Sequence, residues 1–190
     1  MRIAIILFSI LGFFGAPCAG WSQSLQFEGE IIRVDISTES CVLIGEYLFR
    51  NASKSPIQRT LYYPFVISDT LPPPDSIVVW CSQSGEISDY HRQEKAISFP
   101  VTIPADTVTK YTIVYRQTPT KNYFEYILTT TAHWGKPLKS ADFIFMLAHP
   151  IKLQSISYAP DSTVITESAT GYYIHRTNFS PKNNLSISWE

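Results

Sequence analysis

The sequence predicts an all-β protein, a two-sheet antiparallel β-sandwich of immunoglobulin-like style with about ten to twelve strands. From Leu25 onward, apolar residues occur in short runs or in alternation, and no helical periodicity of any length is present. Gly, Pro, Asn and Ser separate these runs, as turn residues do. Charged residues make up only 16% of the chain, and tyrosine and threonine, which suit pleated sheets, take their place.

The N-terminus has the pattern of a secretory signal peptide, which we expect to cover residues 1–20. Arg2 supplies the positive charge, residues 3–14 are apolar, and residues 15–20 are mostly small. Cleavage after Gly20, or a few residues later, would leave the mature protein. A lipoprotein would instead carry its lipid on Cys18, and the proline immediately before it argues against that. An uncleaved anchor is disfavoured because the apolar run is shorter than the roughly 20 residues that span a bilayer.

The mature chain is therefore expected to be exported, to the periplasm or to the extracellular space, with no membrane span after signal cleavage. Removal of Arg2 takes one of the 15 basic residues, against 16 acidic ones. A slightly negative protein offers no electrostatic attraction for nucleic acid, so we expect no nucleic-acid partner.

The first half of the mature chain contains four predicted strands, at residues 25–36, 41–50, 57–67 and 76–81. Alternation in the first places Phe27, Gly29, Ile31 and Arg33 on one face. The second is almost continuously apolar, which is typical of a central strand. Pro64 lies in the third, and proline is confined to the edges or bulges of sheets.

Later strands follow turn signals at similar spacing. A weak hairpin is predicted at residues 87–91 and 95–101, and residues 109–117 alternate cleanly. After the central segment we expect strands at 151–158, a hairpin over 164–176 that turns at 169–171, and a closing strand at 185–189.

The central segment, residues 123–147, predicts a β-hairpin broken by Gly135 and Pro137. Three consecutive threonines favour a strand over a helix because β-branched side chains crowd the helical backbone. Alternation divides its first strand into a core face and a polar face. The core face would hold Phe124, Tyr126, Leu128 and Ala132, and the polar face Glu125, Thr129, Thr131 and His133.

The polar face of this hairpin is a candidate binding surface. His133 lies beside Thr129 and Thr131 and next to Trp134, where these four side chains could line a shallow groove. The competing interpretation is a solvated histidine at a strand end.

Two cysteines, Cys41 and Cys81, remain after removal of the signal peptide. In an oxidising compartment an even pair often forms a disulfide, so we treat this pair as a candidate bridge. The alternative is two buried thiols that pack as small apolar side chains.

The mature residues, 21–190, are expected to form a single domain. A sub-boundary could fall at residues 118–122, but the roughly 70 residues beyond it would make a small core on their own.

Three segments resemble a family of exported bacterial proteins catalogued only as a domain of unknown function. They are residues 45–51 with the following Tyr-Tyr-Pro-Phe at 62–65, the Leu-Thr-Thr-Thr-Ala-His-Trp-Gly core within 126–142, and residues 178–181 leading into 185–189. The first also distantly resembles the β-sandwich domain of vault and inter-alpha-trypsin inhibitor proteins. The resemblance implies a secreted β-sandwich and no known activity.

Catalytic and metal-binding patterns are absent from the sequence. None of the four histidines has a second ligand at the spacing of a zinc motif, so we predict no metal site. There is no Gly-x-Ser-x-Gly elbow and no glycine-rich phosphate loop, so we predict no catalytic residue and no cofactor. Carboxylates of the glycosidase kind could still pair in three dimensions, among Glu28, Glu30, Glu46, Asp75, Glu86, Asp89, Glu125 and Asp142.

The leading functional hypothesis is a non-enzymatic protein-interaction or structural module of the cell envelope or extracellular space, with an unknown envelope protein or glycan as partner. One alternative is a carbohydrate-binding module with a face of aromatic rings drawn from Tyr62, Tyr63, Tyr90, Tyr123, Trp134, Tyr172 and Tyr173. Another is a hydrolase whose residues converge only in the folded chain.

Overall fold

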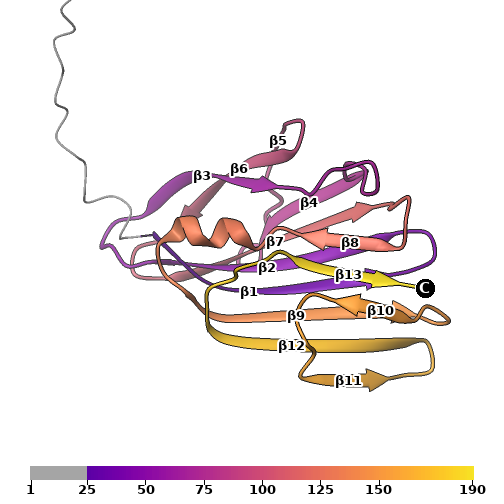
Figure 1. The fold of residues 1–190 in the computed structure, drawn as a ribbon. Helices are drawn as coiled ribbons and strands as arrows, with labels where there is room; N and C mark the ends of the chain where they lie inside the picture. Colours follow the sequence, from indigo (N-terminus) through magenta and orange to yellow (C-terminus); the bar gives the residue numbers. More distant parts are fainter. Residues whose placement is uncertain (1–24) are drawn as a thin grey trace, which may run out of the picture.

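The structure is a computed structural model that describes residues 25–190 (Figure 1). The predicted signal peptide, residues 1–20, lies outside the described residues. Within residues 25–190 no helix is both long enough and apolar enough to cross a membrane.

The described chain forms thirteen strands and one short 3-10 helix, η1 (Thr129–Trp134). The strands before η1 are β1 (Leu25–Ile36), β2 (Cys41–Asn51), β3 (Ile57–Pro64), β4 (Ser76–Cys81), β5 (His91–Arg92), β6 (Ala96–Ile103), β7 (Val108–Gln117) and β8 (Tyr123–Tyr126). Those after it are β9 (Leu138–Ala148), β10 (Leu153–Ile156), β11 (Ser162–Ile165), β12 (Ala169–Phe179) and β13 (Leu185–Trp189).

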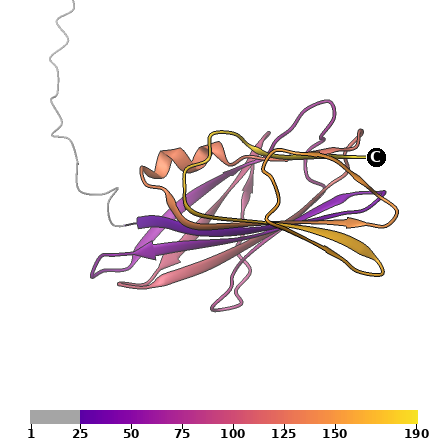
Figure 2. The ribbon, with the colours of Figure 1, turned by 60° about the horizontal axis from the view of Figure 1, so that its bottom comes forward.

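The strands form two layers, and the prediction of an all-β sandwich is confirmed. One layer is a seven-stranded sheet in the order β11-β12-β9-β1-β2-β7-β4. Two three-stranded sheets, β10-β13-β8 and β3-β6-β5, form the other layer together with η1 (Figure 2). Apolar side chains from both layers, and from both sides of residues 118–122, belong to one hydrophobic core.

One pair of strands is parallel, whereas we expected antiparallel pairing throughout. Residues 29–36 of β1 pair with residues 140–147 of β9 in the same direction. The chain reaches β9 from β8, which lies in the opposite layer, so β9 enters the large sheet by a crossover and not by a hairpin turn.

The predicted central hairpin is therefore wrong. Its two halves form β8, which pairs with β13, and β9, which pairs with β1 and β12. The threonine run between them is the helix η1. The hydroxyl of Thr131 donates to the carbonyl of Leu128 over 2.8 Å, and Gly135 ends the helix in the left-handed region with φ 71°. Threonine bonds back to the backbone three residues earlier, which favours a tight turn over a strand, and glycine tolerates the positive φ.

The prediction that Phe27, Gly29, Ile31 and Arg33 share one face of β1 is wrong, because the strand contains a β-bulge. The register with β2 shifts between Phe27 and Gly29, so Glu28 is the additional residue. Phe27 is buried, and after the bulge the buried side chains are those of Glu30, Ile32, Val34 and Ile36. A bulge reverses the inside-outside alternation beyond it, and it carries Glu30 into the core.

Strand boundaries were predicted well where turn residues bracket a run. Strands β1, β4 and β13 have the predicted bounds, and β3 ends at Pro64. The late hairpin turns at residues 166–168, three residues before the predicted turn, and the predicted strand at 87–91 reduces to an isolated bridge and the first residue of β5.

The predicted disulfide is also wrong, since Cys41 and Cys81 are both free. They lie on opposite sides of β7, where Cys41 is paired with Gln117 and Cys81 with Tyr111. Gln117 and Tyr111 are six residues apart on β7, which corresponds to about 20 Å along the strand. The Cα atoms of a disulfide lie within roughly 7 Å of each other.

Candidate functional site

The four residues of the predicted binding surface do not share a face. Thr129 is exposed and donates to the Oδ1 atom of Asn184, and the ring of His133 is exposed and contacts the carbonyl of Thr130. Thr131 is only 6% exposed. Trp134 packs on the rings of Phe27 and Phe49, with centroids 5.7 and 5.6 Å away. Because η1 is a helix, strand alternation does not apply to it.

Thr131 and Trp134 instead line a small cavity under η1, which we call the Glu30 cavity. Its volume is about 70 Å³. The wall comes from β1, β2, β3, β8 and the η1 segment, through Phe27, Glu30, Tyr47, Phe49, Tyr62, Tyr63, Pro64, Tyr126, Ile127, Thr130, Thr131 and Trp134. Tyr62 is 61% exposed, so the cavity reaches the surface where β3 lies beside η1.

A chain of buried hydroxyl groups leads from Glu30 across the core. Tyr126 donates to the Oε2 atom of Glu30 over 2.9 Å, the hydroxyls of Tyr126 and Tyr47 are 3.3 Å apart, and those of Tyr47 and Tyr63 are 2.7 Å apart. Four strands from both layers therefore contribute to one polar network in an otherwise apolar core.

Gly45 makes room for this network. The Tyr47 ring lies back over Gly45, and a Cβ atom at that position would overlap the ring and its hydroxyl. The glycine thus allows the Tyr47 hydroxyl to lie between those of Tyr63 and Tyr126.

Burial controls the ionisation of the network. Glu30 is 1% exposed, and desolvation raises its pKa from 4.5 to about 7, against the opposing effect of the Tyr126 hydrogen bond. Desolvation likewise raises the pKa of Tyr47, Tyr63 and Tyr126 well above 10, and the nearby Glu30 charge raises it further. These hydroxyls stay protonated at neutral pH while the carboxyl group titrates.

The second oxygen of Glu30 has no hydrogen-bond partner within the described chain. Buried carboxylate oxygens without a partner are rare in folded proteins, because each costs the free energy of its lost hydration. The Glu30 cavity therefore contains an acceptor that residues 25–190 leave unsatisfied.

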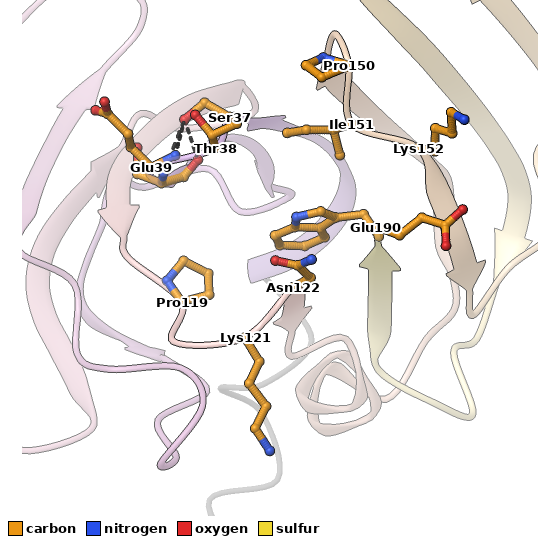
Figure 3. Close-up of a pocket in the computed structure, with 12 residues that line it drawn as sticks. Ser37, Thr38, Glu39, Pro119, Lys121, Asn122, Pro150, Ile151, Lys152 and Glu190 are labelled. Atoms are coloured by element: carbon orange, nitrogen blue, oxygen red, sulfur yellow. Dashed lines mark hydrogen bonds between the residues drawn. The ribbon is translucent and has the colours of Figure 1, made fainter.

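A second concave site, which we call the end groove, lies at the end of the sandwich where β1 and β13 finish. Its volume is about 580 Å³. The β1–β2, β7–β8 and β9–β10 loops and the end of β13 line it. The lining residues are Ser37, Thr38, Glu39, Ser40, Pro119, Lys121, Asn122, Pro150, Ile151, Lys152, Trp189 and Glu190 (Figure 3).

Hydrogen bonds fix the walls of the end groove. The Ser37 hydroxyl donates to the carbonyl of Ser40 over 3.0 Å and accepts from the N–H of Ser40 over 3.1 Å. Lys152 and Glu190 exchange two backbone hydrogen bonds of 2.9 Å, and the Trp189 N–H donates to the carbonyl of Asn122. The groove is thus preformed and not a gap between loose loops.

The end groove has an apolar floor and charged margins. In Figure 3, Ile151 points towards the wall that carries Ser37 and Glu39, while Lys152 and Glu190 lie on the other side and Lys121 points away. Trp189 is 7% exposed and belongs to the floor. Apolar centres with polar rims are typical of protein-binding surfaces.

The remaining sequence candidates do not come together. Tyr62 and Tyr63 are on β3 and Tyr172 and Tyr173 on β12, which belong to different sheets. No group of three or more His, Cys, Asp or Glu side chains within residues 25–190 is arranged to hold a metal ion. His175 pairs with Asp142 at 2.6 Å on the exposed outer face of the large sheet.

Sequence reasoning missed the central residues of both sites. Glu30 is one of the eight candidate carboxylates, and strict alternation places it on the face of β1 that does not carry Phe27. The only signal was an acidic residue directly before the apolar pair Ile31-Ile32, and that signal also fits an exposed position. Nothing in the sequence brings Ser37, Pro119, Ile151 and Trp189 together, since they come from four separate segments.

Comparison with known proteins supports the fold. No family model and no curated protein matches the sequence, so the resemblance to uncharacterised exported proteins stays a prediction. Among solved structures, a "putative nutrient binding protein" of Legionella pneumophila superposes with a TM-score of 0.71 and 13% identity, over 87% of this chain and 67% of its own.

An M1 zinc metallopeptidase of Deinococcus radiodurans superposes with a TM-score of 0.53 and 6% identity, over 87% of this chain and 42% of its own. At such identities the likeness extends to the fold alone. This chain is similar to one part of each of these longer proteins.

Proposed function

We propose that this protein is a non-enzymatic interaction module of the cell envelope or extracellular space, and that its end groove binds a segment of an exported partner protein. The observation that carries the proposal is the construction of the groove. An apolar floor with preformed walls and a charged rim can bury a protruding apolar side chain of the partner, while the rim fixes its orientation.

The charges at the rim suit a polar, zwitterionic segment better than a strongly charged one. Lys121 and Lys152 carry positive charge, and Glu39 and Glu190 carry negative charge. A partner with both signs of charge beside an apolar side chain would complement this rim.

The similar structures support a modular role. The matching region makes up 67% of the Legionella pneumophila chain and 42% of the Deinococcus radiodurans chain. A β-sandwich of this kind therefore occurs within longer proteins, as an interaction domain would.

The two alternatives have less support. The candidate aromatic rings for sugar stacking belong to different sheets, and Trp134 is packed against Phe27. For a hydrolase the groove offers the Ser37 hydroxyl, but this hydroxyl donates to a backbone carbonyl and not to a base.

The test is capture of the partner from envelope extract with the mature protein and two variants. Asn122→Trp fills the groove from an exposed position, and Lys54→Glu changes an exposed lysine in the β2–β3 turn, at the opposite end of β2. We expect one protein to be captured equally by the wild type and by Lys54→Glu, and at least about tenfold less by Asn122→Trp. Capture that is indifferent to Asn122→Trp, or absent altogether, would overturn the proposal.

A further inference from the structure

The Glu30 cavity is a second site, independent of the end groove. We propose that it binds the head of a primary ammonium compound, with the Glu30 carboxylate as counter-ion and the surrounding aromatic rings as a cage. Three features of the cavity support this ligand class.

The first feature is the missing partner of Glu30. Its Oε2 atom accepts from Tyr126, but Oε1 is buried with no partner among the residues that the structure describes. Among the residues that line the cavity there is no Lys, Arg or His. Within residues 25–190 the cavity wall therefore supplies no cation to balance this carboxylate, and a buried charge without one is strongly disfavoured. A cationic ligand with N–H donors would satisfy both the charge and the free oxygen.

The second feature is the aromatic wall. Phe27, Phe49 and Trp134 form a cluster with ring centroids 5.3 to 5.7 Å apart. The Tyr47 ring joins the cluster through Phe27, at 6.2 Å. The faces of aromatic rings attract organic cations, most strongly where water is excluded. Such a wall selects an alkylammonium over a small metal ion, which prefers a shell of oxygen ligands.

The third feature is size. The cavity volume of about 70 Å³ corresponds to roughly two water molecules. This is room for an ammonium group and one carbon atom, so a longer alkyl stem would have to leave past Tyr62 and Thr130.

The titration of the site gives the proposal a pH signature. The groups that face Glu30 are the hydroxyls of Tyr47 from β2, Tyr63 from β3 and Tyr126 from β8, and η1 contributes only the neutral Thr130, Thr131 and Trp134. Since Glu30 has a pKa of about 7 in the free protein, its ionised fraction is about tenfold greater at pH 8 than at pH 6. Binding of an ammonium ion should strengthen by a similar factor.

The experiment is calorimetric titration of the mature protein with methylammonium chloride at pH 6 and pH 8, at constant ionic strength. We expect saturable binding that is about tenfold tighter at pH 8, and a quenching or shift of tryptophan fluorescence from Trp134. A parallel titration with Nα-acetyl-lysine amide shows whether the site accepts the ammonium group of a lysine side chain or only that of a free small amine. Acetamide, which is similar in size but uncharged, should not bind.

Glu30→Gln should reduce the affinity for methylammonium at pH 8 by at least about tenfold. Glu28→Gln removes a glutamate two residues away that pairs with Lys139, and it should bind like the wild type. Circular dichroism verifies that both variants are folded. Tyr126→Phe removes the hydroxyl that donates to Glu30 and so perturbs the same carboxyl group without replacing it. The absence of saturable binding by the wild type, or equal binding by Glu30→Gln, would show that the Glu30 carboxylate is not the counter-ion of an ammonium ligand and would overturn the proposal. Neither result depends on Asn122 or the end groove.

Discussion

At the scale of single residues, Glu30 is the least expected feature of the molecule. Strict alternation separates it from Phe27, but the bulge at Glu28 places both on the buried face, where the Tyr126 hydroxyl satisfies one of the Glu30 oxygens. A carboxyl group in such surroundings prefers the protonated form, because desolvation penalises the charge. Stability should therefore depend on pH through this residue.

We predict that the folded protein loses stability through Glu30 as the pH rises from about 4.5 to about 7. In this window the folded state, with a Glu30 pKa of about 7, binds more protons than the unfolded state, with a pKa of 4.5. The free energy of unfolding falls when the folded state is the more protonated one, in total by about 3 kcal/mol. Glu30→Gln should lack this fall and should exceed the wild type in stability above pH 7.

Denaturant unfolding of both proteins from pH 4.5 to pH 8, in buffers free of amines, measures this difference directly. Asp161, whose pKa is lowered mainly by a hydrogen bond from the His175 N–H, titrates alike in both proteins and cancels from the comparison. Parallel profiles for the wild type and Glu30→Gln would contradict the prediction.

At the scale of elements, the segment from β8 through η1 separates residues that sequence alternation had grouped together. Phe124, Tyr126 and Leu128 are buried as predicted, because alternation holds through β8 and for two residues beyond it. Beyond Leu128 the chain coils, so Thr131 points inward and Ala132 is exposed. The hydrogen bond from the Thr131 hydroxyl to the Leu128 carbonyl favours this helical turn locally.

Three substitutions test this description of η1. Leu128→Ala should cost roughly 2 to 5 kcal/mol because it opens a cavity in the core. Thr131→Ala should cost about 1 to 3 kcal/mol, since the Leu128 carbonyl keeps the Thr131 N–H but loses the hydroxyl, and removal of the buried side chain leaves a small cavity. His133→Ala, at an exposed position, should cost less than about 1 kcal/mol.

Thermal or denaturant unfolding of the three variants establishes the order. In a β-hairpin, Thr131 and His133 would share the solvent-exposed face, and both substitutions would then be mild. Equal small effects at these two positions would therefore favour the hairpin over the helix.

At the scale of the whole molecule, the order of strands determines which distant residues meet. The large sheet places β7 between β2 and β4, which keeps the two cysteines apart. The same order brings the ends of β1, β7 and β9 to one end of the large sheet, where β13 of the other layer also ends and the end groove lies. Both outcomes depend on strand neighbours that are far apart in the sequence.

We predict that the mature protein contains two free thiols with different reactivity. Cys41 is fully buried, and burial raises its pKa to about 12, whereas Cys81 is partly exposed at the end of β4. An alkylating reagent should therefore modify Cys81 alone in the folded state, because the thiolate is the reactive form. Both cysteines should react after unfolding.

Mass spectrometry without reductant follows both steps. A mass lower by two hydrogens, with no alkylation after unfolding, would show that the thiols are bridged and that the strand order of the large sheet is wrong.

The sequence by itself determined the all-β class, most strand positions and the buried face of β8. These properties arise from local causes. Alternation fixes which side chains share a face, and proline or glycine ends a run, as Pro64 does for β3. Each can be inferred within a window of a few residues.

Only the tertiary structure decided the strand order, the bulge, the crossover through η1 and both candidate sites. A single additional residue at Glu28 reverses the inside and outside of the strand beyond it, and the sequence gives no sign of the change because β1 reads as alternating on both sides of the bulge. Tyr126 meets Glu30 across the two layers although 96 positions separate them, and Trp189 lines the end groove together with Ser37 from the other end of the described chain. Such contacts are selected by the packing of two layers as a whole, and no local pattern encodes them.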